Sequence, residues 1–234
     1  MITILSIDIG LKTLSFCKEQ YNIQSIYNIK PPLKSSQYEK HGIATNDMID
    51  YINKVSSFGN VLSLDIYDLG SKLDYFSGKA FNNLISILEE KLKLGFFDNV
   101  SNIIIEQQMK TNNIALSLMW YIHCWCNTIF GPFKKLELYP SKNKTRILGA
   151  PLKKEIDTTT ILGKKSTKTI KITKYERKKW SVTYVKLLLQ NRNDTINLDF
   201  INKHKKKDDL SDTIVQSLSW VVKHASDYYH KNKK

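Results

Sequence analysis

The chain has 234 residues, 41% of them hydrophobic, which is enough for one sizeable folded domain over residues 1–234 and argues against a disordered chain. Its 36 lysines and arginines outnumber 22 acidic residues, and the net charge of +14 favours nucleic acid as a partner, with an anionic membrane surface as the second candidate. Three cysteines without a regular framework favour a reducing, intracellular compartment.

The N-terminal segment is predicted to form strands. Residues 2–7 are a β-branched apolar run that stops before Gly10, which indicates a central buried strand and is too short for a signal peptide. Residues 14–17 and 23–29 predict two further strands around a polar turn at 19–22. Three consecutive strands indicate an antiparallel meander.

The next segment is expected to elaborate this sheet. Residues 31–78 begin with two prolines and are interpreted as an insertion, with a short helix at 47–55 and a strand at 61–67. Residues 80–94 carry apolar side chains at helical spacing, and Gly95 follows as a stop signal. A helix over 80–94 is therefore predicted.

The middle of the chain completes the pattern. Residues 102–106 predict a short strand that ends in an acid, and 136–139 predict a last strand. The uncharged stretch 111–133 is long enough to span a bilayer, but its polar residues favour a buried helix over 113–130, so no membrane partner is expected. The order β-β-β-α-β-α-β predicts an α/β protein with a mixed five-stranded sheet flanked by helices.

The last third of the chain is basic and then helical. Residues 153–174 are rich in lysine and threonine and predict a mobile loop or a hairpin. Residues 174–189 predict an amphipathic helix. A final helix is expected from about 208 to 229, because its apolar residues keep a spacing of three to four.

Four acids lie where a folded core normally holds neutral side chains. Asp8 interrupts the first strand, Glu106 ends the fourth, and Asp209 and Asp212 share one face at the start of the last helix. Each alone has an ordinary explanation as a strand-end or helix-cap residue. Together, oxygen ligands of this kind favour Mg²⁺ or Mn²⁺ over zinc, and two such ions can hydrolyse a phosphodiester. The four acids therefore predict a metal-dependent nuclease.

The segments around these acids resemble the acidic motifs of RuvC-like Holliday junction resolvases, which belong to the RNase H-like superfamily. They are SIDIG at residues 6–10, IIEQQ at 104–108 and KKDDLSD at 206–212. The pattern is most similar to the viral (poxvirus and iridovirus) and fungal mitochondrial branch. That branch shares the K-K-D-D-x-x-D opening of the last helix and a strand ending in P-S-K, here YPSK at 139–142.

The resemblance implies an RNase H-like fold, a homodimer, and paired symmetric nicks in four-way DNA junctions. It further implies two Mg²⁺ ions per active site, which Mn²⁺ can replace, held by Asp8, Glu106, Asp209 and Asp212. No small-molecule cofactor is expected. The motif branch and the bias towards lysine, asparagine and isoleucine favour a viral source, and hence the site of viral DNA replication as the place of action.

Basic residues complete the expected site. Lys142 follows the last strand and is expected to act in catalysis, because a cation beside the acids can bind the scissile phosphate. The lysines of residues 153–171 and 203–207 can follow DNA backbones, although a solvated surface is the alternative. The residues expected to bind DNA are Lys142, Lys144, Arg146, Lys205, Lys206 and Lys207.

Two other functions use the same features. An RNase H-type ribonuclease acting on RNA–DNA hybrids needs the same acids. A catalytically silent DNA-binding protein of this fold needs only the positive charge, but four acids would repel phosphates unless a metal were bound. Cleavage in Mg²⁺ against binding in a chelator separates the last case from the other two.

Overall fold

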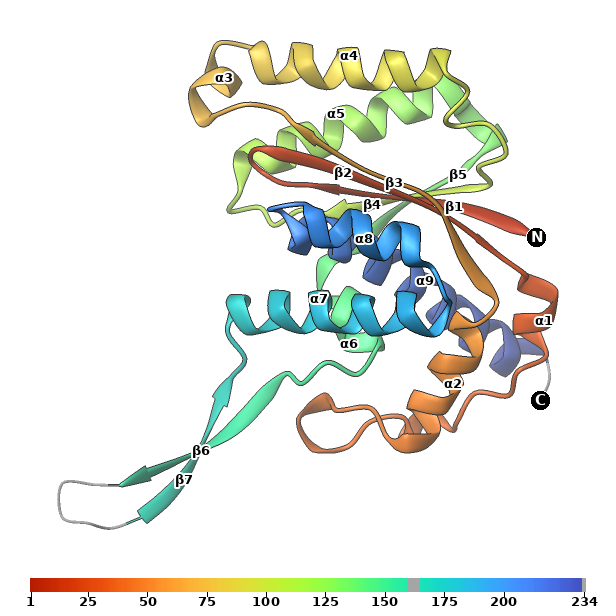
Figure 1. Cartoon of the computed structure of the whole chain (residues 1–234), viewed down its shortest axis with the longest axis vertical. Coiled ribbons are helices and arrows are strands. Elements are labelled where there is room, and N and C mark those ends of the chain that lie inside the picture. The colour runs from red at the N-terminus through yellow and green to blue at the C-terminus, as the bar shows by residue number, and fades with distance from the viewer. Residues whose placement is uncertain (160–164, 233–234) are drawn as a thin grey trace.

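A five-stranded sheet forms the centre of the computed structural model, which describes residues 1–159 and 165–232 (Figure 1). In chain order its strands are β1 Ile2–Ile9, β2 Thr13–Tyr21, β3 Gly59–Asp68, β4 Asn102–Gln107 and β5 Lys135–Pro140. Across the sheet the order is β3-β2-β1-β4-β5. The strands β1, β2 and β3 pair antiparallel, whereas β4 runs parallel to β1 and β5 parallel to β4. The predicted mixed five-stranded sheet is confirmed.

Helices cover both faces of this sheet (Figure 1). They are α1 Ile23–Tyr27, α2 Asn46–Ser56, α3 Lys72–Phe76, α4 Lys79–Lys93, α5 Asn113–Phe130, α6 Ser141–Ile147, α7 Lys174–Asn191, α8 Thr195–Lys203 and α9 Lys207–Asn232. Short 3-10 turns are η1 Lys34–Ser36, η2 Lys40–Gly42 and η3 Gly131–Phe133, and a separate hairpin consists of β6 Lys153–Thr159 and β7 Lys165–Lys171. Within residues 1–159 and 165–232, no helix has both the length and the apolar character needed to cross a membrane.

Successive side chains of β1 enter two different cores, because a strand points its side chains alternately to opposite faces. Leu5 and Ile7 pack with α4 and α5 on one face of the sheet. Ile4 packs with α2, α7 and α9 on the other face. The same alternation places Asp8 on the α9 face.

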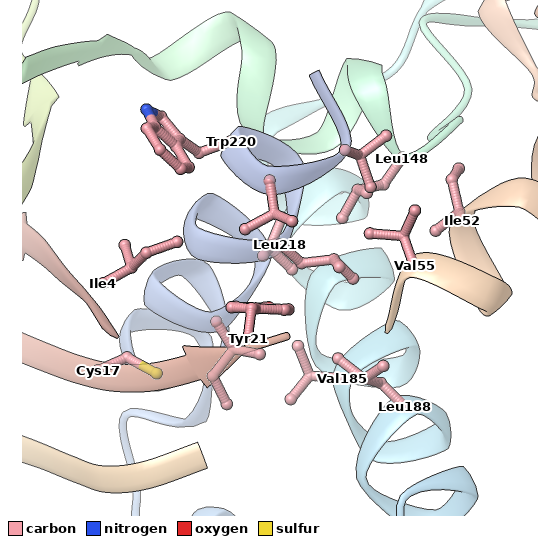
Figure 2. Close-up of a cluster of buried hydrophobic side chains, with 14 of the residues drawn as sticks. Ile4, Cys17, Tyr21, Ile52, Val55, Leu148, Val185, Leu188, Leu218 and Trp220 are labelled. Atoms are coloured by element: carbon pink, nitrogen blue, oxygen red, sulfur yellow. The ribbon is translucent and has the colours of Figure 1, made fainter. Parts of the chain in front are cut away.

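The core on the α9 face joins distant parts of the chain (Figure 2). Val55 of α2, Val185 of α7 and Leu218 of α9 are fully buried there, together with Tyr21 at the end of β2. Burial of one such aliphatic side chain contributes about 1.5–3 kcal/mol to stability. This packing fixes α9, and with it the acids of its first turns, against the sheet.

One of the predicted strands is wrong. Residues 23–29 contain the helix α1 instead, and the third strand of the sheet is β3. The cause is local. Tyr21 lies opposite Ile2, the first residue of β1, so β2 has no further partner residues on β1 beyond Tyr21. Asn22 then caps a helix, since its side chain accepts a hydrogen bond from the Ser25 amide at 3.3 Å.

Residues 31–78, interpreted as an insertion, contribute to the sheet and to the core. β3 is the edge strand beside β2. The buried face of α2 includes Met48, Tyr51 and Ile52. The predicted helix at 47–55 and strand at 61–67 are confirmed, and only the segments around them lie outside the regular layers.

Gly149 joins α6 to the β6–β7 hairpin and supports a first stability prediction. Its φ is +81°, and a Cβ there would lie 2.3 Å from the Ala44 Cβ. Gly149→Ala is therefore expected to cost about 1–2 kcal/mol for the left-handed backbone and more for the clash. The matched control is Gly78→Ala, which has φ +80° but nothing within 4 Å. Urea unfolding of both variants measures the difference, and equal losses would contradict the close approach of Ala44.

Candidate active site

Two acids meet at the carboxyl ends of parallel strands. In the register of β1 and β4, Ile7 lies opposite Ile105, so the next residues, Asp8 and Glu106, are neighbours. Both side chains face α9, because Ile4 on β1 and Ile104 on β4 belong to the core on that side. The two carboxyl groups share a hydrogen bond.

The helix α9 adds a third buried carboxyl group, that of Asp212. Gln216, one turn further along, holds α9 in place: its side-chain amide donates to the carbonyl oxygens of Ile7 and Ile104, at 3.2 Å each. These bonds tie the helix to the two strands that carry the other acids.

A buried lysine bridges the first two acids. The Lys144 ammonium lies 3.4 Å from Asp8 Oδ2 and 3.2 Å from Glu106 Oε1, and its side chain is only 5% exposed. Burial would lower the pKa of Lys144, but the charges of Asp8 and Glu106 outweigh burial and raise it above its usual range. Lys144 is therefore a permanent cation inside the site.

One ammonium does not balance three buried carboxylates. Burial and the charge of Asp8 raise the pKa of Glu106 well above its usual range. Burial, opposed by Lys144 and reinforced by Asp8, raises the pKa of Asp212 to about 6. Burial alone would raise the pKa of Asp8, but the charge of Lys144 and the contacts with Glu106, Lys144 and Lys178 together outweigh burial and lower it. The site thus retains a demand for positive charge, which a proton or a cation can meet.

The donor set fits a hard divalent cation. Asp8, Glu106 and Asp212 offer carboxylate oxygens, the ligands that Mg²⁺ and Mn²⁺ prefer. Among the residues that the structure describes, no three acidic, histidine or cysteine side chains form a closed ligand set. Lys144 already bridges two of the acids, so a metal ion has to compete with its ammonium for the same oxygens.

Asp209 contacts other side chains than the three acids around Lys144. Its Oδ2 accepts a 2.8 Å hydrogen bond from the Thr13 hydroxyl, and its Oδ1 lies 3.4 Å from the Lys178 ammonium. Lys178 also pairs with Asp208 and is one-third exposed. Burial lowers the pKa of Lys178, but the bond to Asp208 and the neighbouring acids raise it overall. This pair forms the outer edge of the site.

The structure assigns the lysines differently from the sequence. Lys142, expected in catalysis, is exposed on α6, whereas Lys144 contacts the acids. The helix over 141–147 was not predicted from the sequence. Without that helix, the direction in which Lys142 and Lys144 point could not be derived. Lys178 was not predicted as a site residue either. The sequence signal for it was its position three residues before Ser181, on the face of α7 that also carries the buried Val185.

The other basic residues surround the site or remain at the surface. Arg146 is exposed on α6. Lys205 and Lys206 are exposed and Lys207 is half-buried, immediately before the acids of α9. Lys144 is too buried to contact a DNA backbone outside the site.

The chain is similar in sequence to viral proteins and in structure to a viral resolvase. The 170L protein of Invertebrate iridescent virus 6 is 28% identical over 225 residues, which cover 94% of this chain and 89% of that protein. The 97L protein of Invertebrate iridescent virus 3 is 32% identical over 119 residues, 51% of this chain and 47% of that protein. The crystal structure of fowlpox virus resolvase with its substrate Holliday junction DNA aligns with a TM-score of 0.53 at 14% identity, over 95% of this chain and 99% of that chain.

No family model matches the chain. The structural match shows a shared fold, and the sequence matches are to iridescent viruses. The predicted mixed five-stranded sheet flanked by helices is therefore confirmed, and the chain shares its fold with fowlpox virus resolvase.

Proposed function

We propose that this protein is a Holliday junction resolvase, a DNA endonuclease that makes paired symmetric nicks in four-way junctions. The observation that carries the proposal is the buried set of Asp8, Glu106 and Asp212 around Lys144, at the end of parallel strands. The fold shared with fowlpox virus resolvase supports the same reading. So does the net charge of +14, which suits a DNA substrate.

The proposed chemistry is phosphodiester hydrolysis. Two divalent ions, Mg²⁺ or Mn²⁺, held by Asp8, Glu106, Asp209 and Asp212, would supply an activated water and stabilise the leaving oxygen. Lys144 offsets the charge of Asp8 and Glu106 and holds their carboxyl groups together. Lys178, at the outer edge, is the cation best placed to meet a phosphate of the cut strand.

Paired nicks require two sites, and we propose that a homodimer provides them. The helix α5 has no charged residue, although Trp120 on it is 47% exposed. Protein interfaces are enriched in aromatic residues and depleted of charged ones, and α5 has that composition. The similarity to iridescent virus proteins supports a viral source, and thus action where viral DNA replicates.

Metal binding is expected to depend on pH. Asp212, with a pKa of about 6, is protonated below that pH and must lose its proton to solvent when its carboxylate binds a metal ion. The affinity for Mn²⁺ should therefore weaken by up to about tenfold per unit as the pH falls below 6, and level off above 7. Calorimetry in buffers with different ionisation heats measures both the affinity and the released proton. Equal affinity at pH 5 and pH 7 would contradict the assignment of Asp212 as a ligand.

Cleavage assays test the function directly. A labelled four-way junction, a linear duplex and an RNA–DNA hybrid are incubated with the protein in Mg²⁺. Symmetric nicks in the junction alone are the expected result. Cutting of the hybrid instead would move the function to a ribonuclease with the same acids. Junction binding without any cutting would indicate a silent DNA-binding protein.

A further inference from the structure

The β6–β7 hairpin extends away from the body of the protein (Figure 1). It belongs neither to the central sheet nor to the two cores. Both of its ends lead to the active site, because β6 follows α6, which carries Lys144, and β7 precedes α7, which carries Lys178. The direction of the hairpin is therefore linked to the position of the acids.

The root of the hairpin is held by the loop around η2. The Leu152 amide donates to the His41 carbonyl at 2.8 Å, and the Ile172 amide donates to the Leu152 carbonyl at 3.1 Å. Glu155 on β6 pairs with Lys40 at 2.5 Å and lies 3.3 Å from His41 Nε2. These contacts give the loop around η2, part of the segment interpreted as an insertion, a role as a brace.

A second contact ties the root to α7. Lys154 pairs with Glu176. Glu176 also accepts bonds from the amide and hydroxyl of Thr173, which completes the cap at the start of α7. Hence Glu155 and Glu176 are both engaged by other residues, and neither pairs with Lys153 or Lys171, which face each other at the root of the hairpin.

The hairpin carries lysines without acidic partners. Lys153 lies directly opposite Lys171 in the register of the two strands. Like charges in that arrangement destabilise a strand pair. Both side chains are exposed, as is that of Lys168, and within the part of the chain that the structure describes none of the three has an acid at ion-pair distance. The repulsion between these lysines is offset when a polyanion binds to the hairpin.

We propose that the β6–β7 hairpin is a DNA-binding arm, which holds the phosphate backbone of a duplex outside the active site while the loop around η2 fixes its angle. The proposal rests on the proposed function, since it names a second contact with the same substrate. Lys153 and Lys171 are the principal contacts, and Glu155 positions them through Lys40 and His41. Contacts of this kind orient DNA without reading its bases.

The test is DNA affinity as a function of salt. A Lys153→Gln/Lys171→Gln variant is compared with wild type on a four-way junction in chelator, where no cutting occurs. Each lost phosphate contact lowers the slope of log affinity against log salt by about 0.9, so a decrease approaching about 1.8 is expected, with affinity at 0.1 M salt lower by roughly tenfold or more.

The matched control removes the same charge elsewhere. Lys54 on α2 and Lys93 on α4 are exposed, and both lie near the end of the sheet where β1 begins, away from the acids. A Lys54→Gln/Lys93→Gln variant should keep the wild-type slope. If both double variants change affinity equally, only the net charge matters and the arm is excluded. If the hairpin variant loses self-association while its DNA affinity is unchanged, the arm contacts protein and the proposal is wrong.

The contact of Glu155 with Lys40 and simple electrostatics predict opposite effects of Glu155→Gln on DNA affinity. Glu155→Gln removes a negative charge beside the arm, which by charge alone should tighten DNA binding. If Glu155 fixes the arm through Lys40, the variant should instead bind several-fold more weakly with an unchanged salt slope. Binding as tight as wild type or tighter would exclude the brace.

These outcomes are separable from the proposed function. If the wild-type protein cuts junctions and the hairpin variant has the same salt slope as the control variant, only the DNA-binding arm is excluded. If the wild-type protein cuts no junction but the hairpin variant still loses DNA affinity and has a lower salt slope, the resolvase function is excluded. The proposal that the hairpin binds DNA then stands.

Discussion

Asp8→Asn is expected to lower the rate of junction cleavage by roughly a hundred- to a thousandfold, the scale reached when one group that stabilises transition-state charge is removed. Asp8 lies at the end of β1, shares a hydrogen bond with Glu106 and is 3.4 Å from Lys144. The amide keeps the shape of the carboxyl group but not its charge, so metal binding should fail while the fold persists. Junction affinity, measured in chelator, should stay within a few-fold of wild type.

The control for this variant is Asp208→Asn. Asp208 is on the same helix as Asp212 but pairs with Lys178 at the outer edge, not with the buried set. It removes the same charge and should retain most of the cleavage rate. Full cleavage by Asp8→Asn, or equal loss in both variants, would show that the buried acids are not the catalytic centre.

Lys144→Met is expected to destabilise the metal-free protein by about 3–5 kcal/mol at pH 7, the usual cost of leaving buried charges without their partner. Asp8 and Glu106 would lose the ammonium that bridges them. A divalent ion can take the place of the ammonium. Mg²⁺ or Mn²⁺ at about a hundred times its dissociation constant should therefore restore about 2.7 kcal/mol of the free energy of unfolding. Urea unfolding with and without metal measures both effects.

A second buried lysine provides the control. Lys91 on α4 pairs with Asp65 at 3.0 Å and is 7% exposed, but it lies among aromatic rings on the other face of the sheet. Lys91→Met should also destabilise the protein, and metal should not restore the loss beyond its effect on wild type. A Lys144 variant that is as stable as wild type without metal would mean that the three carboxyl groups are already neutral.

The parts of the fold that follow from local pattern were predictable. The strand at 102–106 and the helix at 113–130 are confirmed almost to the residue, since a short apolar run, an uncharged helical stretch and a cap at Asn112 all act locally. Strand β3 was placed, but its pairing was not, because β2 and β3 are joined by contacts far apart in sequence. The polar turn expected at 19–22 failed for the same reason: Glu19 is fully buried and pairs with Arg192 of the distant α7 end.

The sequence pattern pointed to the acids as candidate site residues, but it did not indicate which lysine lies beside them. Asp8 and Glu106 follow directly from parallel strands whose ends coincide. The choice of Lys144 over Lys142 depends on one short helix of seven residues, for which the sequence holds no cap: Pro140 at its start makes no side-chain hydrogen bond. The position of such a helix is set by packing against α9, which only the assembled fold provides.

The hydrogen bonds of Gln216 to Ile7 and Ile104 also determine when the proposed active site can form during synthesis of the protein. The bond to Ile7 joins residues 209 positions apart in the chain. At ribosomal speeds of about 5–20 residues per second, the first acid is made on the order of ten seconds or more before the last. A nascent chain cannot place Asp212 beside Asp8 until α9 has left the ribosome, so polysomes bearing partial chains should carry no cutting activity towards nearby DNA.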